Sequence, residues 1–380
     1  MSIKILHIVS MLESGGVENM LYNYSCHMDE TIMNQSFASH SLGGQISEKL
    51  IAKGNYVYYV SPKRNGLLKY FKNLIKLLQC TKWDIIHVHQ NFGSIIPLAI
   101  AKIVGISVRI SHAHGSRLRD RKGNTFYEKL LSIVLRFVAT DFMACGNEAA
   151  IWMFGRKSVK NNRVVIIKNA IDLDKFSFSE INRKNIRNTL NIDFETKCIG
   201  QVARMTEEKN HEFALLVYYE YLKNNANSRL IFIGDGPLRN KIEKKAISLG
   251  IKYKVLFIGN VDNVAEYLSA FDLLILPSIH EGLPLTPIEA QANGLRSLIS
   301  TGVPYEVSIT KLVSFLDLEK GVTSWADEMK IILNNEKRED VRTDLKAAGY
   351  DCVSAANVLE KLYIKLYNRK YKKINRNYLR

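Results

Sequence analysis

Short apolar runs alternate with helix-like segments along nearly the whole chain, and this alternation limits the fold more than any other feature. Polar or glycine-containing turns bound the runs, and the segments between them carry apolar residues at helical spacing. Alternating strands and helices predict doubly wound parallel sheets. We expect strands at residues 5–9, 56–60, 84–89, 108–111, 141–145 and 164–167, and in a second series at 198–203, 229–233, 255–258, 273–277 and 298–300.

The two series of strands predict two α/β domains, and 380 residues are enough for two domains of ordinary size. A polar segment separates the series, so we place the first domain at 1–168 and the second at 169–352, followed by a helix at 353–380. Five scattered cysteines favour a reducing compartment and argue against a disulfide framework. No run of 18 apolar residues occurs, so we expect no transmembrane helix.

Basic residues gather in the first half of the chain and at its end. Residues 1–168 carry 22 Lys and Arg against 10 Asp and Glu, whereas residues 169–350 carry 23 against 25. Lys69, Lys72 and Lys76 share one predicted amphipathic helix, and more positive charge lies in the loop 117–122 and the tail 368–380. Such charge suits either an anionic membrane surface or a merely solvated face. Nucleic acid is not predicted as a partner, because interleaved aromatics and a recognition module are missing.

Two acids, Glu281 and Glu289, are separated by seven residues in a loop between an apolar strand and a helix start. Ligands of open α/β sheets bind beyond the carboxyl ends of the strands, and a helix start offers free amides to a phosphate. Carboxylates beside such a site could hold sugar hydroxyls. A purely structural interpretation is also open, in which Thr286 as N-cap, Pro287 at N1 and Glu289 at N3 form a capping box.

Two other strand-end loops carry residues suited to phosphate. Arg204 and Lys209 follow one predicted strand, and this pair suits a diphosphate, although the acids at 207–208 could partner both cations at the surface. Gly15 and Gly16 follow the first strand, where glycine lets a backbone approach a ligand closely. Neither a dinucleotide-binding fingerprint nor a P-loop motif occurs.

The pair His112 and His114 follows the strand at 108–111. We interpret the two rings as facing opposite sides of the strand, and no third ligand lies close to them in the sequence. No metal site is therefore predicted there. One of the two rings could point toward a ligand at the strand end, and a core or loop histidine is the other interpretation.

These features together resemble the retaining GT-B glycosyltransferases with an E-x7-E motif, the group 1 glycosyl transferases that include bacterial capsule, exopolysaccharide and lipopolysaccharide enzymes. Order, spacing and strand-end placement carry the resemblance, which covers nearly the whole chain. The matching elements are the two α/β domains, Gly15-Gly16, Arg204 with Lys209, Gly234-Asp235-Gly236-Pro237, and Glu281 with Glu289. The resemblance implies two Rossmann-like domains facing a cleft, an acceptor-binding N-terminal domain and a nucleotide-sugar-binding C-terminal domain. It also implies that the last helix returns to the N-terminal domain.

The same resemblance implies roles for single residues. Glu289 would hold the ribose of a nucleotide sugar, and Glu281 would face the donor sugar. Arg204 and Lys209 would neutralise the diphosphate. The remaining implied contacts are backbone amides of Gly282, Leu283 and Leu285 beside the sugar, Asn260 and Val261 against the base, amides of Gly15 and Gly16 at the diphosphate, and His114, or else His112, near the donor sugar.

We therefore expect a retaining, metal-independent hexosyltransferase that moves a sugar from a UDP-sugar to a lipid-linked oligosaccharide in cell-surface polysaccharide biosynthesis. The nucleotide sugar and the glycan acceptor would be its partners, no cofactor would be needed, and it would act in the cytoplasm at the inner face of the membrane. Two alternatives stay open: an acceptor-independent UDP-sugar epimerase or hydrolase of the same fold, and a non-catalytic subunit that binds sugar nucleotide or membrane. The donor sugar, linkage and oligomeric state are not predicted.

Overall fold

The computed structural model describes residues 2–378 except 14, 42, 116–124 and 336, and for residues 125 and 370–378 it describes the backbone alone. The chain forms two compact units: unit 1 comprises Met1–Ile171 and Asp351–Arg380, and unit 2 comprises Asp172–Tyr350. The basic loop 117–122 and most side chains of the basic tail lie outside the described residues.

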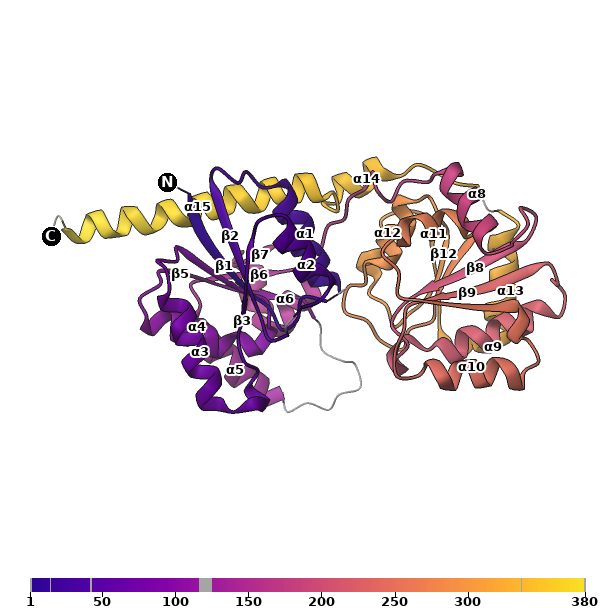
Figure 1. The fold of residues 1–380 in the computed structure, drawn as a ribbon, viewed down its shortest axis with the longest axis horizontal. Helices are drawn as coiled ribbons and strands as arrows, with labels where there is room; N and C mark the ends of the chain where they lie inside the picture. Colours follow the sequence, from indigo (N-terminus) through magenta and orange to yellow (C-terminus); the bar gives the residue numbers. More distant parts are fainter. Residues whose placement is uncertain (1, 14, 42, 116–124, 336, 379–380) are drawn as a thin grey trace. The chain divides into compact units, whose positions relative to one another are not determined.

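Unit 1 is built on a parallel sheet of seven strands in the order β3-β2-β1-β4-β5-β6-β7 (Figure 1). Helices cover both faces of this sheet, as the alternating sequence pattern predicts. The strands are β1 (Ile3–Ile8), β2 (Met33–Ser39), β3 (Tyr56–Tyr59), β4 (Ile85–Val88), β5 (Val108–Ala113), β6 (Asp141–Ala144) and β7 (Val164–Ile166), and the helices are α1 (Gly16–His27), α2 (Gln45–Ala52), α3 (Leu67–Gln79), α4 (Ile95–Ile103), α5 (Thr125–Val138), α6 (Asn147–Phe154), α7 (Arg156–Lys160) and α15 (Cys352–Tyr378).

The long final helix α15 belongs to unit 1. Its residues Ala356, Leu359, Tyr363 and Leu366 are buried in one core with Met20, Leu21 and Tyr24 of α1 and with apolar residues of β1, β2 and β5. Chain entry into α15 is held by a hydrogen bond from the Cys352 amide to the Ile171 carbonyl, 2.9 Å long. The last helix therefore closes the sheet face on which α1 also lies.

Unit 2 has a parallel sheet of six strands in the order β10-β9-β8-β11-β12-β13. Helices α9, α10 and α13 pack in the core of one face, and α8 and α11 pack in a second core. The strands are β8 (Lys197–Val202), β9 (Ser228–Ile233), β10 (Val255–Gly259), β11 (Leu273–Leu276), β12 (Ser297–Ser300) and β13 (Val313–Leu316), and the helices are α8 (Glu180–Thr189), α9 (His211–Leu222), α10 (Arg239–Ser248), α11 (Val264–Ala270), α12 (Thr286–Ala292), α13 (Gly321–Leu333) and α14 (Arg342–Ala347).

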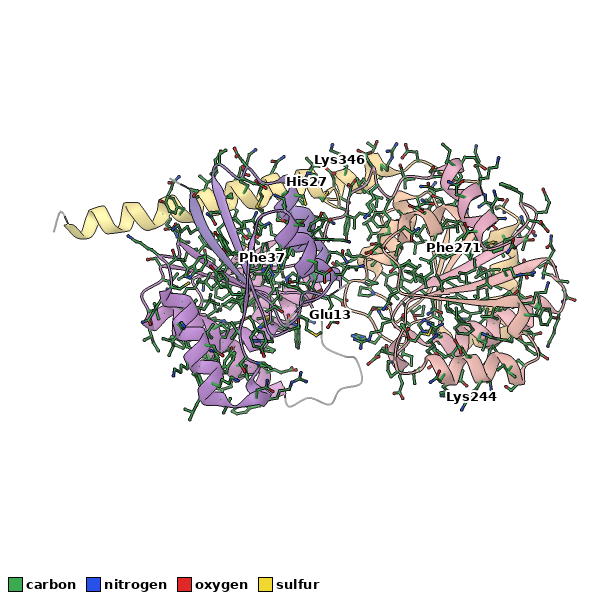
Figure 2. The ribbon with its side chains drawn as sticks, viewed as in Figure 1. Glu13, His27, Phe37, Lys244, Phe271 and Lys346 are labelled. Atoms are coloured by element: carbon green, nitrogen blue, oxygen red, sulfur yellow. The ribbon has the colours of Figure 1, made fainter. Side chains whose placement is uncertain are left out.

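Buried aromatic rings fill both units, with Phe37 in unit 1 and Phe271 in unit 2 among the labelled side chains (Figure 2). Gly200 in β8 has no side chain because a Cβ there would overlap the Phe271 ring. Buried Arg187 donates to Asp272 at 2.7 Å, and the same carboxylate accepts the Cys198 amide at 2.7 Å. These contacts lock α8 to the two central strands, which fixes the loops that follow them.

The prediction of two parallel α/β sheets is confirmed, but two strands were missed. Strand β2 reads Met-Asn-Gln-Ser-Phe-Ala-Ser, and its polar residues Gln35, Ser36 and Ser39 are buried. The edge strand β13 is only partly buried. Neither shows the apolar run that marks the other strands. Among the described residues, no helix has the length and apolar character needed to cross a membrane.

Candidate functional site

The loop after β8 presents an exposed arginine and a half-buried lysine. The Arg204 side chain is exposed and makes no hydrogen bond or ion pair with any other residue that the structure describes. Lys209 ends a short 3₁₀ turn, and its carbonyl accepts a hydrogen bond of 2.8 Å from the buried Gln201 side chain. The Arg204 guanidinium is thus a free cation at the carboxyl end of a central strand.

Lys209 is paired with Glu281 rather than with the acids at 207–208. The Lys209 ammonium donates to Glu281 Oε1, and Ser278 Oγ donates to the same oxygen at 2.9 Å. The lysine side chain is 26% exposed and the glutamate side chain 8%. Because β8 and β11 are neighbours in the sheet, residues far apart in the sequence meet at one edge. A partly buried ion pair of this kind orders both charges in one loop cluster.

The loop after β11 is tied to its neighbours through the backbone. The Ile279 amide donates to the Glu208 carbonyl at 2.8 Å, and the Glu281 amide donates to the Gly302 carbonyl at 3.1 Å. A Cβ at Gly302 would overlap the Ile279 carbonyl oxygen, so only glycine allows this approach. These bonds hold the Glu281 carboxylate at a defined position before any ligand binds.

The amides of Gly282, Leu283 and Leu285 remain available. Within the described residues none of the three donates to a backbone acceptor, and all three residues are partly exposed. Uncommitted amides are suited to oxygen atoms of an anionic or hydroxyl-bearing ligand.

Glu289 lies on the first turn of α12, partly exposed, and its carboxylate makes no hydrogen bond or ion pair with another described residue. Burial raises its pKa to about 7, and the nearby Lys175 opposes this shift. The predicted capping box is wrong: the N-cap is Leu285, and the Thr286 hydroxyl instead donates to the Val202 carbonyl at 3.3 Å. Among the residues that the structure describes, Glu289 therefore has no hydrogen-bond or ion-pair partner that would explain its position.

The Gly234–Pro237 turn packs directly against the loop that carries Arg204. Gly234 has φ of +119°, and a Cβ on it would overlap the Ala203 carbonyl oxygen. The Met205 amide donates to the Asp235 carbonyl at 2.9 Å, and the Gly234 amide donates to the Gly259 carbonyl at 2.8 Å. The exposed Asn260 and the partly exposed Val261 follow directly, so the carboxyl ends of β8, β9 and β10 are joined at the same edge.

In unit 1, Gly15 and Gly16 lie at the start of α1. Gly15 has an extended backbone, with φ of −141°, and its carbonyl accepts the Asn19 amide at 2.9 Å. A Cβ at Gly15 would overlap the Glu18 carboxylate, which folds back over the helix start and whose pKa is raised by burial. Because the Glu18 side chain is flexible and can move aside, this contact alone does not require glycine at position 15.

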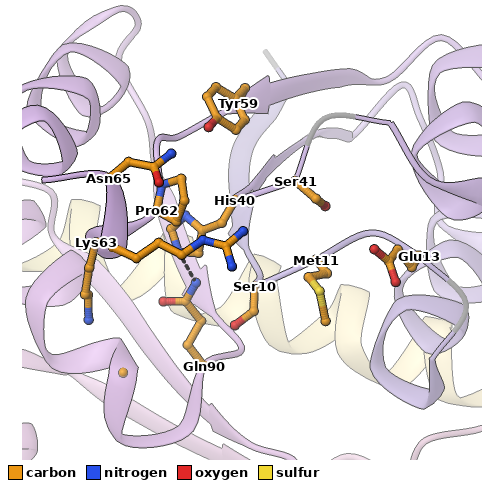
Figure 3. A pocket seen from close by; sticks show the side chains of 12 residues that line it. Ser10, Met11, Glu13, His40, Ser41, Tyr59, Pro62, Lys63, Asn65 and Gln90 are labelled. Atoms are coloured by element: carbon orange, nitrogen blue, oxygen red, sulfur yellow. Dashed lines mark hydrogen bonds between the residues drawn. The ribbon is translucent and has the colours of Figure 1, made fainter. Parts of the chain in front are cut away.

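A cavity of about 640 Å³ opens beyond the carboxyl ends of β1, β2, β3 and β4 in unit 1 (Figure 3). His40 Nδ1 donates to the Val60 carbonyl at 2.9 Å, and His40 Nε2 accepts from the Gln90 side-chain amide at 2.9 Å. The cavity is lined by Ser10, Met11, Glu13, His40, Ser41, Tyr59, Pro62, Lys63, Arg64, Asn65, Gln90 and Gly93. The lining therefore contains two cations, Lys63 and Arg64, and one acid, Glu13. This cavity was not predicted from the sequence, because its residues come from four separate loops.

The interpretation that His112 and His114 face opposite ways is wrong. Their ring centroids are 4.0 Å apart, because residues two apart on a strand share a face. Further ligands are also nearby: His89 Nδ1 lies 2.8 Å from His114 Nε2, and His87 Nε2 lies 3.1 Å from His112 Nδ1. The repeated His-x-His pattern at 87–89 and 112–114 was the sequence signal for this cluster.

The predicted residues thus divide between the units. Lys209, Glu281, Arg204 and the glycine turns gather at one sheet edge of unit 2, with Glu289 on the helix that follows. Gly15, Gly16 and His114 lie in unit 1.

Comparison with known proteins follows this division. Residues 14–175 match the family described as Glycosyltransferase Family 4, and residues 182–351 match Glycosyl transferases group 1. The chain is 28% identical over 370 residues to EpsF of Bacillus subtilis (strain 168), named as a glycosyltransferase, covering 95% of this chain and 96% of EpsF. It is 26% identical over 311 residues to the Escherichia coli UDP-Gal:alpha-D-GlcNAc-diphosphoundecaprenol alpha-1,3-galactosyltransferase, covering 78% and 79%.

Solved structures show the same fold at low identity. HepE of Anabaena, in a complex with UDP and glucose, matches with a TM-score of 0.72 at 14% identity, covering 98% of this chain and 99% of HepE. WaaG, a glycosyltransferase of lipopolysaccharide biosynthesis, matches with a TM-score of 0.70 at 14% identity, covering 96% and 98%. These similarities confirm the GT-B fold.

Proposed function

The chain belongs to the glycosyltransferases of polysaccharide biosynthesis, with a Family 4 domain followed by a group 1 domain, and from this premise we propose that it transfers a sugar from a UDP-sugar to a lipid-linked oligosaccharide with retention of configuration. The observation that carries the proposal is the set of loops in unit 2 where Arg204, Lys209 and Glu281 meet. HepE binds UDP, and the Escherichia coli relative has UDP-galactose and a diphosphoundecaprenol acceptor in its name.

The donor binds at the carboxyl end of the unit 2 sheet. Glu289, which has no partner among the described residues, accepts hydrogen bonds from the ribose hydroxyls. Glu281 and the free amides of Gly282 and Leu283 face the sugar hydroxyls. Asn260 and Val261 lie against the base. A carboxylate kept partly dry and unpaired is a strong acceptor for hydroxyl donors, which supports the role of Glu289.

The chemistry depends on the negative charge that develops on the leaving diphosphate. Arg204 stabilises this charge. The Lys209 ammonium, which is paired with Glu281 in the free protein, also interacts with the diphosphate when the donor is bound. The leaving phosphate assists attack of the acceptor hydroxyl from the same face, which keeps the anomeric configuration. No metal ion is needed at the diphosphate, because two protein cations fill that role.

The acceptor binds in the unit 1 cavity. Its volume of about 640 Å³ accommodates sugar rings, and Ser10, His40 and Gln90 supply polar groups for their hydroxyls. Lys63 and Arg64 at the same cavity suit the phosphate groups of a lipid-linked carrier.

A neighbouring face of unit 1 is suited to an anionic membrane. Helix α3 carries Lys69, Lys72 and Lys76 with no acid, and its Leu68 is 87% exposed. Helices α4 and α5 follow beside it (Figure 1). Their large exposed apolar side chains include Ile103 and Phe126. Basic charge combined with exposed apolar side chains is typical of binding at a lipid surface, and this face would bring the enzyme to its acceptor at the inner side of the cytoplasmic membrane.

The test is transfer kinetics with Arg204→Ala. Loss of a charge that acts mainly in the transition state lowers kcat by about a hundredfold or more while the Kd for UDP changes much less. Arg229→Ala is the matched control, because Arg229 is the second residue of β9 and lies at the opposite end of the sheet. A kcat within about threefold of the wild-type value for Arg204→Ala would refute the assigned role.

Product analysis separates transfer from the other activities of this fold. We expect the sugar to appear on a lipid-linked acceptor with its anomeric configuration kept. Release of free sugar without acceptor, at a rate that equals transfer, would instead identify a hydrolase, and UDP binding without turnover would identify a binding subunit. Addition of Mg²⁺ should leave the transfer rate unchanged.

A further inference from the structure

Five of the nine histidines form one cluster at the carboxyl ends of three neighbouring strands in unit 1. His7 in β1 is the register partner of His87 in β4, and His87 is the register partner of Ile110 in β5. His89 and His112 follow on the same face of their strands because side chains two apart point the same way. Parallel pairing therefore stacks the rings of His7, His87, His89, His112 and His114.

The cluster is buried on the side covered by α15. Tyr363 of α15 contacts His87 Nδ1 over 2.6 Å, and Phe37 stacks on His7 with ring centroids 5.0 Å apart. His87 and His112 have no exposed surface, whereas His114 is partly exposed. Burial lowers the pKa of all five rings.

Three ring nitrogens take no part in the hydrogen bonds within the cluster or in the bond to Tyr363. Three contacts join imidazole nitrogens: His7 Nδ1 with His89 Nε2, His87 Nε2 with His112 Nδ1, and His89 Nδ1 with His114 Nε2. A neutral imidazole has one donor and one acceptor. Of the three remaining nitrogens, His112 Nε2 is buried without a hydrogen-bond partner among the described residues, whereas the Gln35 and Asn169 side chains lie close enough to the His7 and His114 rings to raise their pKa. Buried nitrogen atoms without partners are unfavourable unless a ligand takes them.

We propose that His89, His112 and His114 form a site for a divalent transition-metal ion of the Zn²⁺ type. One nitrogen from each ring lies within 4.8 Å of the others. Tetrahedral Zn²⁺–nitrogen bonds of 2.0–2.1 Å require about 3.3 Å between the ligand nitrogens, so the rings would rotate when the ion binds. Three histidines and a water molecule are a ligand set that Zn²⁺ takes in proteins. Neutral imidazole suits Zn²⁺, Ni²⁺ and Cu²⁺ rather than Mg²⁺.

A second group, His7, His87 and His89, meets the same distance criterion. It is the poorer candidate, because all three residues are buried and one ring nitrogen of His87 already binds Tyr363. The group with His114 has a partly exposed member, through which an ion can enter and a water ligand can stay in contact with solvent.

The ion would orient the His114 ring at the end of β5. It would not replace Arg204 and Lys209, which belong to unit 2. All the proposed ligands belong to unit 1, so metal binding can be tested independently of the proposed transfer reaction.

The experiment is a Co²⁺ and Zn²⁺ titration of the full chain after treatment with a chelator. We expect one equivalent of Co²⁺ to give the visible absorption of a tetrahedral site, and Zn²⁺ to displace it. His89→Asn and His112→Asn should weaken binding by at least about tenfold. His7→Asn should bind as the wild type does and thereby exclude the second group.

Two control variants report adventitious binding. His27→Asn removes an exposed histidine of α1, labelled in Figure 2, and His40→Asn removes a histidine of the cavity. Neither should change the affinity. Equal losses in the control and cluster variants, or no saturable binding by the wild type, would overturn the proposal and leave a metal-free imidazole stack.

A measurement on the wild type alone covers the case in which the cluster variants do not fold. Zn-edge X-ray absorption should show three imidazole nitrogens at 2.0–2.1 Å. One or two imidazole ligands would contradict the site. The Tm should also rise with Zn²⁺ concentration, since a ligand that binds only the folded state stabilises it.

Discussion

The Glu289 carboxyl provides the sharpest test of the donor site, because it predicts opposite effects on stability and binding. Burial raises the pKa of Glu289 from 4.5 to about 7. The folded state therefore holds this proton more tightly than the unfolded state does. The stability that results is fully present below pH 4.5 and is lost as the pH rises through about 7. A shift of this size corresponds to about 3 kcal/mol, since one pKa unit is worth about 1.4 kcal/mol.

Glu289→Gln removes the titrating group while keeping nearly the same shape. We expect the variant to be up to about 3 kcal/mol more stable than the wild type at pH 8, with the difference shrinking toward pH 5. Its affinity for UDP should fall by about tenfold or more, because the amide replaces one carboxylate oxygen as acceptor for the ribose hydroxyls. A residue that destabilises the free protein and strengthens ligand binding is typical of a functional site.

The assay is urea denaturation of unit 2, followed through the fluorescence of its buried Trp325. Phenylalanine at positions 83 and 152 removes the two tryptophans of unit 1, so that the signal reports one unit. Glu319→Gln, at an exposed residue of the same unit, is the control. The reasoning is refuted if wild type and Glu289→Gln lose stability equally between pH 5 and pH 8, or if both bind UDP with the same affinity.

Three further substitutions test contacts within the individual units. Lys209→Met removes the ammonium that pairs with the Glu281 carboxylate, whose side chain is 8% exposed. Urea denaturation should therefore show a loss of about 2 kcal/mol in the free energy of unfolding, and the added change Glu281→Leu should recover it. A double variant as unstable as the single variant would contradict the pairing. Gly302→Ala should weaken UDP binding, measured by calorimetry, by about tenfold, because the added methyl group displaces the loop that carries Glu281. Circular dichroism should show that the sheet is intact. An unchanged affinity would show that this loop tolerates the shift. Tyr363→Phe leaves a buried nitrogen of His87 unpaired and should lower the stability of unit 1 by about 1–2 kcal/mol, and an unchanged Tm would exclude that hydrogen bond.

The local sequence pattern predicted most of the strands and the loops that carry the candidate site residues. Apolar runs such as Leu273–Leu276 predict buried strands. A strand of a parallel sheet is covered on both faces, so its consecutive side chains are apolar, and this pattern can be read from the local sequence alone. The positions of Arg204, Lys209 and Glu281 after such strands also followed from the sequence, since carboxyl ends of parallel strands share one edge. The polar strand β2 escaped prediction because its burial depends on the strands and helices around it.

Tertiary structure alone decided which of these residues meet. The bond between Lys209 and Glu281 and the contact of the Thr286 hydroxyl with the Val202 carbonyl both depend on the order of the strands, which no local pattern encodes. The histidine cluster shows the same limit, because two His-x-His pairs become one group only through the register of β4 with its neighbours. Register is set by packing between distant segments, so the chemistry at these strand ends appears only in the folded chain.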